Sequence, residues 1–208
     1  ARSWTPSDGT ESGSRSGSSL IRFSYSTAPN VNEGAARPML TEAFRGEFYQ
    51  KVDAKARVSI PAAFRRILEA EDPASAEFPR ARVYMVYGGK HRNFVECYSK
   101  AGADALAAKI EAMELGSPAR DRAERDLISR SVMVEIEPDG RIVLPAKVRA
   151  KMGFLGDDLA KGDEAAFAGF TNRFKLFRRD VYDAELADED DDDGVDPLAL
   201  VGRAARAE

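Results

Sequence analysis

The sequence predicts a β-rich α+β fold built from two homologous half-units with flanking helices. The main observation is a segment that occurs twice, at 57–65 and 141–149, with Arg, Pro, Ala and Arg matching at an offset of 84 residues. Each copy follows one plan, in which a tight turn leads into a short apolar strand and then into a helix opened by proline. Because an internal repeat largely determines architecture, both halves should share one design.

The first half-unit is expected over residues 40–114. Its pattern predicts, in order, a strand at 47–52, a turn at 53–56, a returning strand at 57–60 that completes a hairpin, a helix at 62–70, a loop at 71–80 and a second hairpin at 81–87 and 94–98. Pro61 ends the strand, since it has no N–H for a ladder but suits the first turn of a helix. Ser99 is predicted to cap the helix that follows.

A connecting helix is expected at 115–130, where charges alternate and few residues are apolar. The second half-unit, 131–187, repeats the plan with a strand at 132–136, a turn, a strand from 141, a helix at 146–152, a hairpin at 165–170 and 173–177, and a closing helix. Pro138, Asp139 and Gly140 are turn formers, each for its own steric or hydrogen-bonding reason. Gly153 is predicted to end the helix before it in a left-handed conformation.

Both ends of the chain are expected to be disordered. Residues 1–39 are rich in Ser, Gly, Thr and Pro, and 188–208 form an acidic tail. Residues 183–208 hold ten acidic and two basic residues, a balance of −8, so the preceding 182 residues carry +4 of the total −4. A mildly cationic body is compatible with DNA binding. No apolar run is long enough to cross a membrane, and no signal peptide is recognisable.

The sequence shows no pattern typical of a catalytic or metal site. His91 and Cys97 are the only histidine and cysteine, and neither has the neighbours of a zinc site or a Cys–His pair. A lone cysteine fits a reducing cytoplasm. Gly88 and Gly89 lack the Lys and Ser/Thr of a phosphate-binding loop. We therefore expect no enzyme, no cofactor, no metal and no small-molecule substrate.

The repeated motif closely resembles the MraZ family. It reads Asp53, Lys55, Arg57, Pro61 and Arg65, and again Glu137, Gly140, Arg141, Pro145 and Arg149. The resemblance covers about residues 40–187. Its departures are Ala56, where the family usually has glycine, and Glu137, where aspartate is usual.

The resemblance implies an AbrB/MraZ-like double-split (swapped-hairpin) barrel. Members are bacterial DNA-binding transcription regulators that form ring-like homo-oligomers. They act on short direct repeats upstream of division and cell-wall genes, their own promoter included. It thus implies a cytoplasmic, nucleoid-associated protein whose partners are double-stranded DNA and further copies of itself.

The candidate DNA-binding residues follow from what the two turns can do. A two-stranded ribbon can enter a major groove, where arginine bonds guanine O6 and N7 in a bidentate manner. The candidates for base or phosphate contacts are Lys51, Lys55, Arg57, Arg65, Arg66, Arg141, Lys147 and Arg149. The candidates for supporting the turns are Asp53, Glu137, Asp139 and Gly140.

Two alternatives remain open from the sequence alone. Arg57 could pair with Asp53 purely to hold the turn, which would make it a structural residue. The chain could also be a protein–protein module like a toxin antidote, because AbrB-like folds occur there and the acidic tail could wrap a partner.

Overall fold

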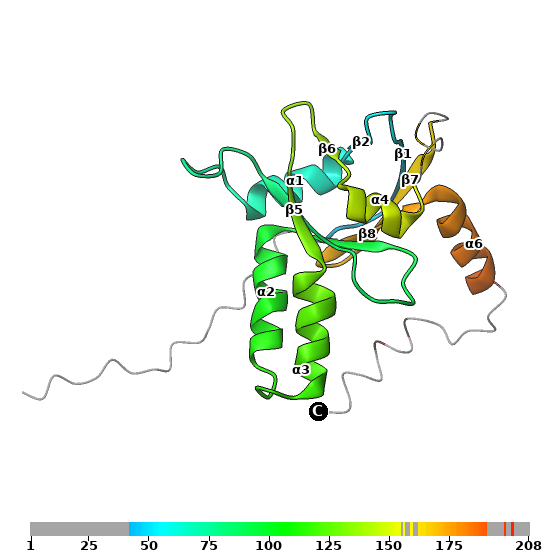
Figure 1. Cartoon of the computed structure of the whole chain (residues 1–208). Helices are drawn as coiled ribbons and strands as arrows, with labels where there is room; N and C mark the ends of the chain where they lie inside the picture. The colour runs from blue at the N-terminus through cyan, green and yellow to red at the C-terminus, as the bar shows by residue number, and fades with distance from the viewer. Residues whose placement is uncertain are drawn as a thin grey trace, which may run out of the picture. The chain divides into compact units, whose positions relative to one another are not determined.

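The computed structural model describes residues 42–154, 156, 159, 162–190, 198 and 201, so the predicted N-terminal extension and most of the predicted tail lie outside the described residues. The first part contains β1 (Glu47–Lys51), β2 (Arg57–Ser59), α1 (Ala62–Glu71), β3 (Arg82–Val86), β4 (Val95–Tyr98) and α2 (Lys100–Glu111). The second contains α3 (Pro118–Ala123), the π-helical turn η1 (Glu124–Ser129), β5 (Ser131–Glu135), β6 (Arg141–Val143), α4 (Ala146–Met152), β7 (Glu164–Phe170), β8 (Arg173–Arg178) and α6 (Arg179–Asp190) (Figure 1).

The strands form a six-stranded sheet in the order β1-β7-β8-β4-β3-β5 and a separate two-stranded ribbon of β2 and β6. Every pair is antiparallel. The order is symmetric under exchange of the halves, because β1 pairs with β7, β5 pairs with β3, and β4 meets β8 in the centre. Neither half builds its own sheet, and the β-rich α+β class predicted from the sequence is confirmed.

The hairpin predicted within the first half at 47–60 is wrong in its pairing. β1 forms its ladder with β7, and beyond its end Val52 N–H donates to the Asp163 carbonyl at 2.8 Å. β2 pairs instead with β6, which places Val58 opposite Ile142. The turn at 53–56 still joins β1 to β2, but the ribbon is assembled from one strand of each half. The two returning strands can thereby bury their apolar residues together.

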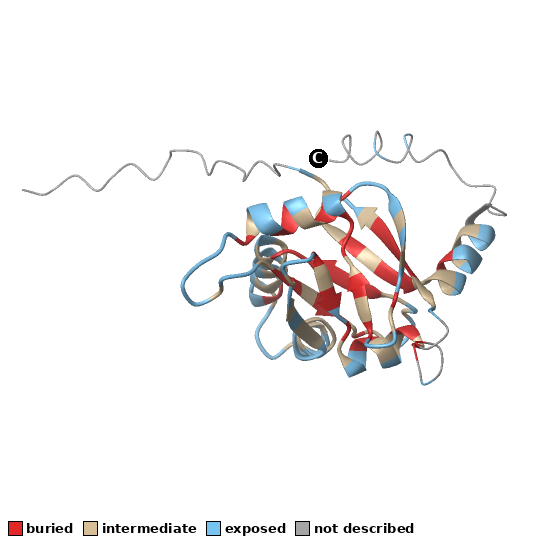
Figure 2. Ribbon diagram, turned by 90° about the horizontal axis from the view of Figure 1, so that it is seen from above, coloured by how far each residue is buried: buried red, intermediate tan, exposed pale blue. Residues whose placement is uncertain are grey.

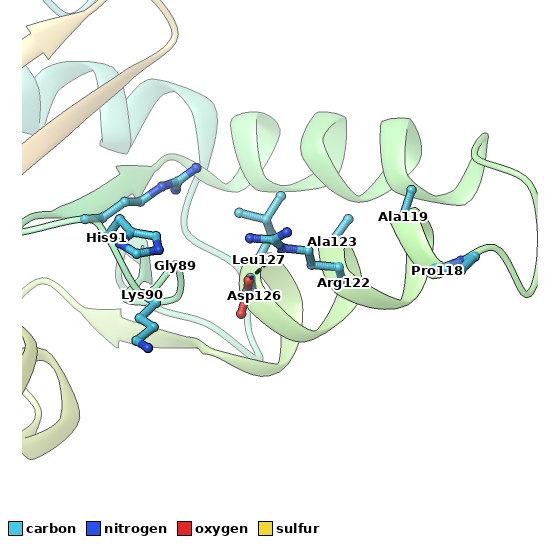
Figure 3. A pocket seen from close by; sticks show the side chains of 10 residues that line it. Gly89, Lys90, His91, Pro118, Ala119, Arg122, Ala123, Asp126 and Leu127 are labelled. Atoms are coloured by element: carbon cyan, nitrogen blue, oxygen red, sulfur yellow. Dashed lines mark ion pairs between the residues drawn. The ribbon is translucent and has the colours of Figure 1, made fainter.

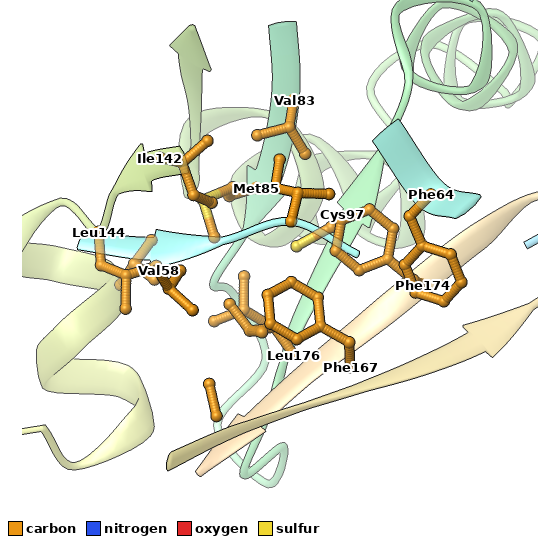
Figure 4. Packing of buried hydrophobic residues seen from close by; sticks show 14 of the residues in the cluster. Val58, Phe64, Val83, Met85, Cys97, Ile142, Leu144, Phe167, Phe174 and Leu176 are labelled. Carbon is orange, nitrogen blue, oxygen red and sulfur yellow. The ribbon is translucent and has the colours of Figure 1, made fainter. Parts of the chain in front are cut away.

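The core lies between this ribbon and the six-stranded sheet (Figure 4). Val58 and Ile142 are almost fully buried and belong to the same cluster as Phe167 and Leu176 of the sheet. Phe64 of α1 completes the layer, and its ring lies 5.1 Å from that of Phe174. Seen from above, the buried residues follow the strands and the inner helix faces, while the outer helix faces are exposed (Figure 2). The ribbon is therefore fixed to the sheet by apolar burial.

Helix α6 packs on β7 and β8 through a second cluster, in which the rings of Phe177 and Tyr182 lie 5.0 Å apart. It continues through Asp190, so the first residues of the acidic tail, which was expected to be disordered from residue 188, are helical. Each added helical residue gains a backbone hydrogen bond, which explains how a helix already nucleated on the sheet can extend into this run. In the part of the chain that the structure describes, no helix has the length and apolarity needed to cross a membrane.

Local signals within single elements were predicted well. The Ser99 hydroxyl accepts a hydrogen bond from Gly102 N–H at 3.0 Å and caps α2. Gly153 ends α4 with a φ of 79°. The segment expected as one connecting helix contains both α3 and η1, whose residues are in a π-helical turn.

Candidate nucleic-acid interface

The first turn is built around the carboxylate of Asp53. Its Oδ1 accepts hydrogen bonds from the backbone N–H groups of Lys55 and Arg57 at 2.8 and 2.9 Å. Its Oδ2 lies 2.7 Å from both Nε and Nη2 of Arg57. The backbone hydrogen bond from Arg57 lowers the pKa of Asp53, and its side-chain bond and the Lys55 N–H lower it further, against some desolvation. One ionised carboxylate therefore closes the turn and orients the guanidinium through Nε and Nη2.

The second turn has the same backbone but a looser side-chain arrangement. Arg141 pairs with Asp139, whose Oδ2 lies 3.5 Å from Nε, rather than with the acidic residue four positions before it. Glu137 contributes through its backbone, because its N–H donates to the Arg141 carbonyl and its own carbonyl accepts from Gly140 N–H, both at 2.8 Å. Arg141 is therefore less firmly oriented than Arg57.

The residue before each arginine has a left-handed backbone, with a φ of 60° at Ala56 and 79° at Gly140. Their carbonyls accept hydrogen bonds from the opposite half, from Leu144 N–H at 2.8 Å and Ile60 N–H at 3.0 Å respectively. For alanine this conformation costs about 1–2 kcal/mol. The Ala56 methyl is buried, which returns about 0.8 kcal/mol. The chain therefore tolerates alanine where the family usually has glycine.

Arg65 reaches from α1 to the second turn. A methyl group added to Gly140 would lie 1.7 Å from Arg65 Nη1, so the guanidinium lies against the Gly140 backbone. This places a cation beside the acidic Glu137 and Asp139, with which Arg65 also lines an open cleft of about 830 Å³. At the offset of 84 residues Arg149 corresponds to Arg65. Its Nε is buried and has no hydrogen-bond partner among the described residues.

The register of β2 and β6 places both arginines on one surface. Arg57 lies opposite Val143, and Ser59 lies opposite Arg141. Since side chains alternate along a strand and Val58 and Ile142 point inward, the other four residues point outward. We call the surface formed by Arg57, Ser59, Arg141 and Val143 the ribbon face. The side chains of Arg57 and Arg141 are 34% and 43% exposed, and both turns project from the same side of the molecule (Figure 1).

Sequence reasoning missed Ser59 and Val143 as site residues. The available signal was the alternation in Arg-Val-Ser and Arg-Ile-Val, which puts the third residue on the same face as the arginine. Val143 lies next to Arg57, and Ser59 next to Arg141, only because β2 pairs with β6. The alternation within one strand does not predict its partner strand.

The other predicted contact residues lie around the ribbon face or further along the helices. Lys55 is exposed at the first turn, and Lys51 is exposed at the end of β1. Arg66 is exposed on α1. Lys147 is exposed on α4, with its Nζ 5.9 Å from the ring centre of Tyr87. The structure thus gathers Lys55, Arg57, Arg65 and Arg141 at the two turns, and spreads the remaining cations over β1, α1 and α4.

A second basic surface lies between the β3–β4 loop and α3 (Figure 3). It is an open cleft of about 690 Å³ lined by Lys90, His91 and Arg122, with Ala119 and Leu127 among its apolar residues. Arg122 lies 3.9 Å from Asp126. A concave cleft suits a small ligand or a peptide segment, whereas a projecting ribbon suits the major groove of a duplex. The ribbon face is therefore the better candidate for contacting DNA.

Comparison with known proteins shows which family the chain resembles. No family model matches the chain. A protein of Cereibacter sphaeroides (strain ATCC 17025 / ATH 2.4.3) named "Transcriptional regulator MraZ" is 48% identical over 165 residues, which cover 78% of this chain and 97% of that protein. Proteins of the same name from Ruegeria pomeroyi and Ruegeria sp. (strain TM1040) are 41% and 39% identical, over 68% and 79% of this chain and 81% and 98% of their own lengths. At this identity and coverage, the chain belongs to the MraZ family of transcriptional regulators.

Proposed function

We propose that the chain is a sequence-specific DNA-binding transcriptional regulator that reads the major groove with its ribbon face. The supporting observation is the pairing of β2 with β6, which brings Arg57 and Arg141 onto one exposed surface with a carboxylate beside each. Residues diagonally opposed in an antiparallel pair lie about 7–8 Å apart, within the width of a major groove of about 12 Å. An arginine held by a carboxylate loses less conformational entropy when it binds a base.

The stability gained from the ion pairs does not by itself account for arginines on the outward side of the ribbon. Arg57 and Asp53 are each about one-third exposed, and surface pairs of this kind contribute little to stability because water and salt screen them. A purely structural role would therefore stabilise the fold only slightly. A role in preorganising the guanidinium for a guanine accounts for both the pair and its position on an outward face.

In this proposal the remaining cations contact phosphates and position the protein on the duplex. Arg65 is placed to do so beside the second turn, and Lys51, Lys55, Arg66, Lys147 and Arg149 would extend the contact. We also propose that the exchange of strands between half-units 40–114 and 131–187, joined through 115–130, is the AbrB-type swapped-hairpin barrel. Closed rings of subunits would then present several ribbon faces to repeated DNA sites.

The target we propose is the promoter of the chain's own gene, within a division and cell-wall cluster, recognised through short direct repeats. The protein would accordingly act in the cytoplasm, at the nucleoid. The alternative, a protein–protein module like a toxin antidote, does not require the ribbon face to contact DNA. Direct measurement of DNA binding therefore separates the two.

The test is a fluorescence-anisotropy titration of the full chain with DNA from upstream of its gene and with a shuffled fragment of equal length. We expect tighter binding to the upstream fragment by at least about a thousandfold, the lower range for specific recognition. Affinity should also fall with salt, with a slope of about −0.9 per phosphate neutralised. Equal affinity for the two fragments at physiological salt would overturn the proposal.

A further inference from the structure

The ribbon face is not symmetric, although the two halves that build it are repeats. At the offset of 84 residues Arg57 corresponds to Arg141, and Ser59 corresponds to Val143. Because β2 and β6 are antiparallel, Val143 lies directly opposite Arg57 and Ser59 lies directly opposite Arg141. The two arginines are the same, but one has an apolar neighbour across the ribbon and the other has a hydroxyl.

Val143 is an apolar residue on the outward side of the ribbon. It is 44% exposed, while its neighbour Ile142 is fully buried in the core. A β-branched residue suits a strand, which would be a sufficient reason for valine if the position had no other role. If strand propensity were the whole reason, replacing Val143 would leave the base preference of the protein unchanged. A role of Val143 in DNA recognition would change that preference, and this difference can be measured.

We propose that Val143 determines base preference beside Arg57 by packing against the 5-methyl group of a thymine. This inference rests on the proposed function. Directly opposed residues have Cβ atoms about 4.5–5.5 Å apart, and successive base pairs are stacked about 3.4 Å apart. If Arg57 bonds a guanine, Val143 across the ribbon therefore lies near the adjoining base pair. An apolar side chain at that place favours thymine, because it can pack against the 5-methyl group.

The other half of the ribbon face reads its base pair differently. A serine hydroxyl both donates and accepts, so Ser59 beside Arg141 can contact either base of a pair and discriminates less. A ribbon with identical halves would suit a site with two-fold symmetry. The difference between Val143 and Ser59 gives the site a direction, with a stricter end at Arg57 and a more permissive end at Arg141.

The experiment measures methyl recognition directly. Each thymine of the upstream fragment is replaced singly by deoxyuridine, which removes only the methyl group, and the affinity of the full chain is measured by anisotropy. The parent is expected to lose about fourfold in affinity at a thymine adjoining a guanine, the value of one buried methyl group. Val143→Ser should bind the unmodified fragment about fourfold more weakly for each engaged subunit. It should bind the unmodified fragment and the deoxyuridine fragment with the same affinity.

Met133→Ser is the matched control, because Met133 is a similarly exposed apolar residue on β5, outside the ribbon face. It should keep the methyl sensitivity of the parent. If the parent binds specifically but shows no methyl sensitivity, or if Val143→Ser retains it, the role of Val143 is wrong and the proposed function stands. If the parent does not distinguish the upstream fragment from shuffled DNA, the proposed function fails and this role fails with it.

Discussion

Arg57→Ala is expected to eliminate specific DNA binding at physiological salt while circular dichroism and particle size remain those of the parent. A bidentate guanine contact contributes about 1–3 kcal/mol of discrimination. In an oligomer the loss is repeated at every engaged subunit, so a modest loss per contact becomes a large one. The fold should persist, because the pair with Asp53 is partly exposed and contributes little to stability.

Three variants serve as controls for that result. Arg57→Lys keeps the positive charge but lacks the planar guanidinium that bonds guanine with two N–H groups. Compared with Arg57→Ala, it should bind DNA of any sequence more tightly but should not recover specific binding. Arg66→Ala, on the exposed side of α1, should weaken binding to all sequences alike and reduce the salt slope by about 0.9. Arg141→Ala should cost less than Arg57→Ala, because Glu137 and Asp139 already lower the local potential.

Two outcomes would contradict the assignment of Arg57. If Arg57→Ala unfolds the protein or changes its oligomeric size, the residue is a structural partner of Asp53. If the variant binds like the parent, the turns are not the recognition surface. The helix residues Arg65, Arg66 and Arg149 would then be the next to test.

Asp72→Ala is expected to destabilise the fold by about 3–5 kcal/mol, the usual effect of removing one partner of a buried ion pair. Arg82 donates to Asp72 from its backbone N–H, Nε and Nη2 at 2.9, 2.8 and 2.6 Å, and both side chains are less than 10% exposed. Removing the carboxylate leaves a buried guanidinium over the Phe78 ring with its charge uncompensated. The pair connects the end of α1 to the start of β3, and so supports the helix that carries Arg65 to the second turn.

Thermal unfolding followed by circular dichroism measures this effect, with a fall in Tm of roughly 10 °C expected for a domain of this size. Glu135→Ala is the control, because its pair with Arg80 is exposed and should contribute less than about 1 kcal/mol. The side-chain hydrogen bond from Arg82 lowers the pKa of Asp72. The stabilisation should therefore be complete above the unfolded-state pKa of roughly 3.9 and be lost only as pH falls through the lower folded-state value. A fall in Tm of Asp72→Ala no larger than that of Glu135→Ala would show that the pair of Asp72 and Arg82 does not stabilise the fold.

The features predicted correctly from the sequence were local ones. Pro61 and Pro145 each open a helix, and Gly140 takes the left-handed conformation that its turn requires. These outcomes depend on backbone sterics within a few residues, which sequence reports directly. The acidic residue four positions before each arginine left a pair across each turn as an open alternative. That pair forms between Asp53 and Arg57, whereas Arg141 pairs with Asp139 instead of Glu137.

The features that were missed depend on contacts between the halves. The pairing of β2 with β6 cannot be read from periodicity, since an alternating strand is compatible with several partners. Ser59 and Val143 consequently did not emerge as neighbours of the two arginines. Ala56 keeps the left-handed turn although the family usually has glycine there, and the buried methyl group that offsets part of the strain cannot be recognised from the sequence.

Amide hydrogen exchange of the full chain, alone and bound to its upstream DNA fragment, tests most directly whether the ribbon face contacts DNA. Mass spectrometry of peptides spanning both turns, the β3–β4 loop and α3 would locate the protected amides. We expect DNA to slow exchange at 53–59 and 139–143 and to leave 89–92 and 118–127 unchanged. Protection of 89–92 and 118–127, with exchange at both turns unaltered, would contradict the account and place the DNA in the cleft beside α3.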